Sequence, residues 1–145
     1  MAHQTLLANW SEAPQTDAAP EKEAAERTMR STIVEILGLL GNLRVAHWQA
    51  STKTNEHKAL GDLYESLDGM VDDFTEALMG MDRNRDMPSK TVTIAGGNGH
   101  EGILSKLQSA VAYLCTSSME AKADDLANIA ADMKQAVNKA RYLLS

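Results

Sequence analysis

The stretch NEHKALGDLYESLDGMVDDFTEALMGM, residues 55–81, carries the pattern that decides the fold of this chain. Its apolar side chains recur at steps of three and four residues, a spacing that gathers them on one face of an α-helix. They are Leu60, Leu63, Leu67, Met70, Val71, Phe74 and Leu78. The segment is therefore predicted to form a helix that buries one stripe of side chains in a core.

Three further segments have the same apolar spacing, and we predict one helix in each of them: residues 21–50, 101–116 and 118–144. Pro20, Glu21 and Glu23 are typical of a helix start, because proline fits the first turn and carboxylates favour the positive end of the helix dipole. Ser118 supplies half of a capping signature at the start of the last segment.

Residues 82–100 separate the second predicted helix from the third and are predicted to form a long loop. Pro88 and the glycines Gly96, Gly97 and Gly99 are turn signals. A glycine-rich run can also cradle phosphate, but this one follows no clear strand and lacks the lysine of a phosphate-binding loop. Two short connections and one long one predict an all-α, antiparallel four-helix bundle, either up-and-down or with one crossover.

The first twenty residues differ from the rest because they show little apolar periodicity. We predict an extended N-terminal arm over residues 1–20 and the bundle over residues 21–145. Leu6, Leu7 and Trp10 suggest that the arm docks on its own bundle or on a neighbouring subunit, with simple disorder as the alternative.

Size and composition predict one soluble domain. The chain has 145 residues and a hydrophobic fraction of 43%, yet no run of about 18 apolar residues that could span a membrane. The opening MAHQTLLANWSEAP lacks the charged start and apolar core of an export signal. The single cysteine, Cys115, can form no internal disulfide and falls on an apolar stripe. These features predict a cytoplasmic protein with a buried structural thiol.

Candidate metal ligands lie where the first predicted helix ends and along the second. His47 stands near the end of the first helix and His57 at the start of the second. On a helical wheel His57, Asp68, Asp72 and Glu76 fall on one flank, beside the apolar stripe. Asp72 and Glu76 are four residues apart and point the same way, as a pair of oxygen ligands should.

One helix alone cannot bring these side chains to one metal ion. His57 lies fifteen residues before Asp72, which is roughly 22 Å along a helix. If the helix pairs antiparallel with its copy in a second subunit, crossing near residues 64–68, His57 of one chain comes opposite Asp72 and Glu76 of the other. The alternative is that these residues form the solvated polar face of a bundle helix.

The same residues resemble those of a known family. The segment LLGNLRVAHWQASTKTNEHKALGDLYESLDGMVDDFTEALMG, residues 39–80, resembles the first two helices of the Dps-type miniferritins, which are dodecameric ferritin-like shells that oxidise and store iron. Residues 124–144 are similar to the family's last helix. The family's His-Trp pair, second histidine, aspartate and glutamate correspond to His47 with Trp48, His57, Asp72 and Glu76.

The resemblance implies a site, a function and an assembly. In the family the two histidines come from one subunit and the two carboxylates from its two-fold partner, so Asp72 would be a terminal iron ligand and Glu76 a bridging one. Asp62 and Asp68 are further candidates. The implied protein is a ferritin-like, cytoplasmic ferroxidase that uses an oxidant on Fe(II), holds one iron ion or a pair per site, and forms a dodecamer-like shell active against oxidative stress.

Two features depart from the family pattern. The connection between His47 and His57 is two residues shorter than usual, and Gly61 stands where many members have an aspartate ligand. The adjacent Asp62 points about 100° away on a helix. The last predicted helix also has no Glu-x-x-His motif, so the intrasubunit di-iron centre of ferritins is not expected. The departures motivate a second hypothesis, a ferritin-like bundle without competent metal chemistry that serves as a structural or assembly subunit.

The charge balance generates a prediction about nucleic acid. The formal net charge is −6, and the first twenty residues contain neither Lys nor Arg, whereas phosphate binding requires clustered basic side chains. We therefore expect no binding to duplex DNA at physiological salt. A gel-shift assay at low micromolar protein tests this, and a shift that weakens as salt is raised would overturn the expectation.

Overall fold

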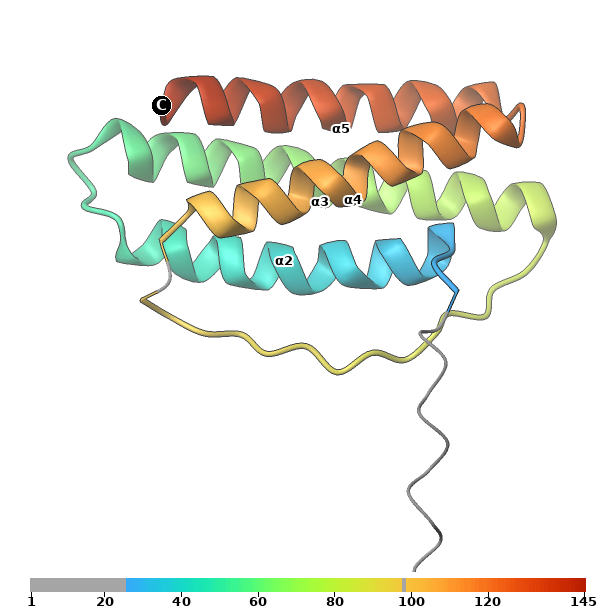
Figure 1. Ribbon diagram of the computed structural model, residues 1–145, viewed down its shortest axis with the longest axis horizontal. Coiled ribbons are helices and arrows are strands. Elements are labelled where there is room, and N and C mark those ends of the chain that lie inside the picture. Colours follow the sequence, from blue (N-terminus) through green and yellow to red (C-terminus); the bar gives the residue numbers. More distant parts are fainter. Residues whose placement is uncertain (1–25, 98) are drawn as a thin grey trace, which may run out of the picture.

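The computed structural model describes residues 26–97 and 99–145. Four α-helices make up most of these residues (Figure 1). In chain order they are α2 (Met29–Gln49), α3 (Asn55–Asp82), α4 (Glu101–Glu120) and α5 (Asp124–Leu143). No β-strand occurs in the described ranges, so the all-α prediction is confirmed there. None of these helices is long and apolar enough to cross a membrane. The predicted arm over residues 1–20 and the helix start at Glu21 lie outside the described residues.

The four helices form a bundle with one long crossover. Helices α2 and α3 make one antiparallel hairpin and α4 and α5 make a second, while the connection between the hairpins runs the length of the bundle (Figure 1). Helix α2 packs on α3 and α4, and α5 packs on the same two helices. Every packed pair is therefore antiparallel, whereas α3 and α4 point the same way. Of the two topologies that the sequence left open, the crossover is the one adopted.

The apolar stripe predicted on residues 55–81 forms the part of the core that α3 supplies. Every member of the stripe is buried except Met70, which is half-buried. The other helices meet it with side chains that include Ile36, Leu43, Leu107, Leu114, Leu126 and Met133. Burying one such side chain stabilises the fold by about 1.5–3 kcal/mol, so contact between these stripes holds the helices together.

The first described helix begins later than predicted. Residues Glu26 to Thr28 are not helical and α2 starts at Met29, so the prediction of a helix over residues 21–50 is wrong at residues 26–28. The backbone N–H of Ser31 donates to the Thr28 hydroxyl at 3.0 Å, and the backbone N–H of Thr28 donates to the Ser31 hydroxyl at 2.8 Å. This reciprocal capping box satisfies amide donors at the helix start.

The turn between the last two helices also lies elsewhere than predicted. Helix α4 continues to Glu120, and α5 starts at Asp124 instead of Ser118. Ser118 is buried inside α4, where its hydroxyl donates to the Leu114 carbonyl at 2.6 Å and needs no partner outside the helix. The chain turns instead at Lys122, whose φ of 54° is left-handed.

The crossover follows the outer surface of α2 as an extended strap, residues 83–97. The Asn42 amide donates to the Thr93 carbonyl at 3.1 Å and accepts from the Ala95 N–H at 3.0 Å. Glycines on α2 leave room for the strap, because a Cβ at Gly41 would lie 2.9 Å from the side chain of Ile94, and one at Gly38 would overlap Val92. Both features keep the strap pressed against α2.

The start of the strap is held by a second anchor at the opposite end of α2. The Arg30 guanidinium pairs with the Asp82 carboxylate and also donates to the carbonyls of Asn84 and Asp86. Its hydrogen bond holds the pKa of Asp82 below the usual value. The strap is thus tied to α2 at both ends.

We expect Asn42→Ala to loosen the strap without unfolding the bundle, because it removes both strap hydrogen bonds while alanine favours the helix. Each bond contributes about 0.5–1.5 kcal/mol, so trypsin cleavage after the exposed Lys90 should accelerate roughly tenfold or more. Limited proteolysis with mass spectrometry measures this, with circular dichroism as the check on folding. Asn138→Ala, an exposed change on α5, is the matched control. Equal cleavage rates in both variants would contradict the role of Asn42.

Candidate functional site

The two histidines predicted as ligands meet at the tip of the α2–α3 hairpin. His47 lies in the last turn of α2 and His57 in the first turn of α3. Thr54 caps α3, since its hydroxyl accepts from the His57 N–H at 3.3 Å. The rings stack with centroids 3.9 Å apart and planes inclined by 27°. The short connection therefore brings the two imidazoles into contact.

Each histidine is held by the backbone of the other. The Nδ1 of His47 lies 2.8 Å from the His57 carbonyl oxygen, and the Nδ1 of His57 lies 2.9 Å from the His47 carbonyl oxygen. Because a carbonyl can only accept, both Nδ1 atoms carry the hydrogen, and in the neutral rings both Nε2 atoms keep a lone pair. Such a bond fixes the tautomer and orients a histidine that ligates a metal.

The stacking limits how the pair can bind metal. A nitrogen lone pair lies in the plane of its ring, and these two planes are nearly parallel. A single ion about 2.1 Å from one Nε2 therefore cannot lie in both planes. The pair suits two ions, one for each ring, better than one shared ion.

The predicted carboxylate ligands lie apart from the histidines within one chain. Asp68, Asp72 and Glu76 are exposed on α3, and within the described ranges none of them enters an ion pair. Asp62 is also exposed and pairs with Lys58 at 2.7 Å. Among the described residues, no three potential ligand side chains gather closely enough to hold a metal ion. A site with both histidines and carboxylates needs a second chain.

Arg44, Trp48 and Tyr64 form an aromatic and cationic cluster on α2 and α3, and the sequence analysis identified Trp48 but neither Arg44 nor Tyr64. The Arg44 guanidinium lies 5.3 Å from the Trp48 ring centroid and 5.1 Å from that of Tyr64, and it donates to the Tyr64 hydroxyl at 3.2 Å. Trp48 nevertheless remains 63% exposed. The spacing of Arg44 and Trp48, four residues apart on one helix, was the available signal, whereas Tyr64 required the packing of two helices.

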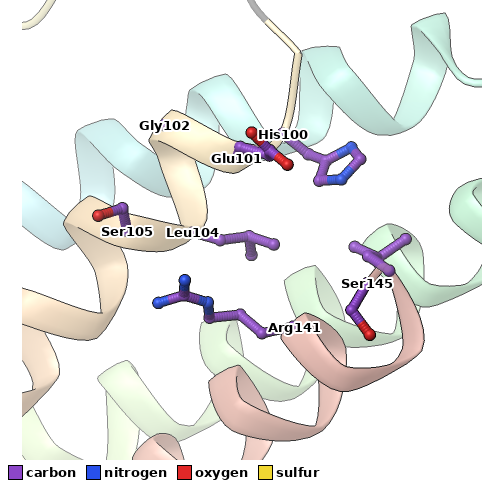
Figure 2. A pocket seen from close by; sticks show the side chains of 8 residues that line it. His100, Glu101, Gly102, Leu104, Ser105, Arg141 and Ser145 are labelled. Carbon is purple, nitrogen blue, oxygen red and sulfur yellow. The ribbon is translucent and has the colours of Figure 1, made fainter.

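A different polar site lies where α4 begins, at the same end of the bundle. The Nδ1 of His100 lies 2.7 Å from a carboxylate oxygen of Glu56, the residue before His57. His100, Ser105 of α4 and Arg141 of α5 line a cavity of about 430 Å³. Figure 2 shows these side chains around it. The cavity contains none of the predicted metal ligands, so the predicted iron chemistry does not involve it.

The cysteine is half-buried in α4, and burial raises the pKa of the Cys115 thiol above its ordinary value. A thiol with a raised pKa is a weak nucleophile at neutral pH. The prediction of a buried thiol is therefore only partly met, because the Cys115 side chain is half-buried.

Comparison with known proteins identifies the family but not its function. No curated protein and no solved structure matches the chain. Residues 47–144 match a family described as a family of unknown function, DUF5856. The match begins at His47 and covers α3, α4 and α5 completely. Because it covers well over half of the sequence, the chain belongs to DUF5856.

Proposed function

We propose that this protein is a ferritin-like, iron-oxidising oligomer in which two chains related by a two-fold axis share each iron site. The observation that carries the proposal is the His47–His57 pair, whose Nδ1 atoms are both occupied and whose Nε2 atoms make no hydrogen bond within residues 26–97 and 99–145. Asp72 and Glu76 of a second chain would complete the site. The single long crossover between two helical hairpins supports the ferritin-like relationship, because ferritin-like bundles have this connection.

The ligand types suit Fe(II) as the substrate. Imidazole nitrogen and carboxylate oxygen together favour iron, with positions left for water or an oxidant. Each Fe(II) would give one electron to an oxidant of the dioxygen or peroxide class and become Fe(III). The negative charge of Asp72 and Glu76 stabilises Fe(III) over Fe(II), which favours oxidation at the site.

The face of the α2–α3 hairpin that carries Trp48 and Tyr64 has charged side chains toward both ends. Arg44 lies toward the end with the histidine pair, and Asp72 and Glu76 lie on α3 toward the other. Antiparallel contact with a second copy, crossing near residues 64–68, would place Arg44 of each chain toward Asp72 and Glu76 of the other. Opposite charges in such a contact fix the register of the two chains.

Exposed apolar side chains on α2 support the same contact. Leu37 is 50% exposed and Trp48 is 63% exposed, and both belong to this helix. Oligomerisation would remove them from water.

The structural alternative is supported by a specific observation. The reciprocal bonds between His47 and His57 join the end of α2 to the start of α3, and they would do so without any metal. In that case the histidine pair stabilises the α2–α3 hairpin, and the protein serves as a structural or assembly subunit. Iron assays on variants distinguish the two functions.

The first test concerns assembly. Light scattering at micromolar concentration should return a dimer or a larger closed oligomer, because half of each site comes from a second chain. Leu37→Lys should shift the mass toward the monomer by placing a charge in the contact. Leu143→Lys is the matched control, since Leu143 is 51% exposed but lies on α5. A wild-type monomer would exclude the shared site.

The second test concerns iron. Asp72→Ala and His57→Ala should each abolish rapid Fe(II) oxidation, followed by absorbance after anaerobic loading and addition of oxidant, and both should retain the helical fold. Asp73→Ala, an exposed neighbour on α3, is the control. If these residues do not bind iron, both variants should oxidise iron like the wild type. Asp72→Ala should then change the free energy of unfolding by no more than about 0.5 kcal/mol, because Asp72 is exposed. His57→Ala should destabilise the fold more than this, because it removes the bond to the His47 carbonyl.

A mixed oligomer of the two variants tests the two-fold arrangement directly. In a heterodimer one site receives both substitutions and the other receives neither, so one of its two sites regains activity. Random mixing of equal amounts of the two variants should therefore restore about a quarter of all sites. Absence of any rescue would contradict a site divided between two chains.

A further inference from the structure

We propose that Gly61 is a positioning residue, which seats the His47 imidazole against α3 and so sets the direction of its free Nε2. The sequence suggested that this position had lost an aspartate ligand. In the structure it contacts the other histidine of the pair, and that contact carries the inference, which rests on the proposed iron site.

The ring of His47 occupies the space that a side chain at Gly61 would fill. A Cβ at this position would lie 2.7 Å from His47 Cε1 and 3.0 Å from His47 Nδ1. A carbon atom cannot approach that closely, so any other residue at position 61 must displace the ring.

The ring cannot move without losing its partners. Its Nδ1 is bonded to the His57 carbonyl at 2.8 Å, and its face is stacked on the His57 ring. Gly61 follows His57 by four residues on the same helix, so both lie on the side of α3 that faces His47. Displacement would therefore break the bond, the stack and the orientation of Nε2 together.

Other glycines in α3 lack such a neighbour. A Cβ at Gly69 or Gly80 would meet no atom within 4 Å. Glycine inside a helix is destabilising relative to alanine, and of Gly61, Gly69 and Gly80 in α3 only Gly61 has a contact that accounts for this cost.

In the proposed iron site the imidazole ligands and the carboxylate ligands belong to different chains. This hairpin supplies two imidazoles and no carboxylate at the position of Gly61, and in the proposed site the negative ligands belong to the second chain. The hydrogen bonds at Nδ1 orient both rings before metal arrives. Gly61 contributes to the site by positioning the His47 ring, and it is not itself a ligand.

The test compares Gly61→Ala with Gly69→Ala, which makes the same change in the same helix. In anaerobic Fe(II) titration Gly61→Ala should bind roughly 10–100-fold more weakly, as is typical when the support of a ligand is lost. Gly69→Ala should bind like the wild type. Equal Fe(II) affinity in the two variants would overturn the positioning role.

A measurement made without metal tests the positioning role of Gly61 separately from the proposed iron site. Nitrogen-15 NMR of the histidine rings should show both Nδ1–H tautomers in the wild type and in Gly69→Ala, and the His47 tautomer should be lost in Gly61→Ala. If wild-type protein fails to bind Fe(II) but this pattern appears, the proposed iron function fails while the positioning of His47 stands. Retention of the His47 tautomer in Gly61→Ala would contradict it.

A double-mutant cycle keeps the test decisive if Gly61→Ala folds poorly. In the wild-type background Gly61→Ala should lower Tm, because alanine displaces the ring. In the His47→Ala background the same substitution should raise Tm, because the ring is absent and alanine favours the helix. The same sign in both backgrounds would show that Gly61 does not act through His47.

Discussion

Asn42 and the glycines of α2 hold the strap along that helix, and the course of the strap sets the direction in which α4 runs. A chain that leaves α3 at Asp82 reaches the far end of the bundle before α4 begins, so α4 runs in the same direction as α3. Each helix then packs only on antiparallel neighbours (Figure 1). The glycines permit this contact because a side chain on either of them would meet the strap.

At the histidine pair, a contact between two helices requires a residue that is unfavourable inside a helix. Gly61 weakens α3 by about 0.5–1 kcal/mol relative to alanine, yet it lets the His47 ring reach the backbone of His57. The result is two imidazoles with defined tautomers at the tip of a hairpin. Local rules of sequence are most often broken at functional sites, and this position fits that pattern.

In the proposed assembly, a second chain accounts for the row of carboxylates on α3. Asp68, Asp72 and Glu76 are exposed and successive members are four residues apart, a spacing at which like charges repel one another. Within one chain, fifteen residues of helix separate Asp72 from His57. Cations or the Arg44 end of a second copy would relieve the repulsion, whereas the isolated chain leaves it to solvent. The metal-site proposal therefore depends on assembly as well as on the fold.

The sequence by itself determined the four helices, the core stripe of residues 55–81 and the separation of His57 from Asp72, because periodicity and rise per residue are local properties of a helix. Tertiary structure alone decided the crossover topology and the turn at Lys122. It also decided the role of Gly61, which sequence comparison had treated as a missing ligand. The role of Gly61 is a contact between two helices. The pattern of apolar residues along one helix predicts which of its faces is buried, but it does not predict which atom of another helix lies beside a glycine.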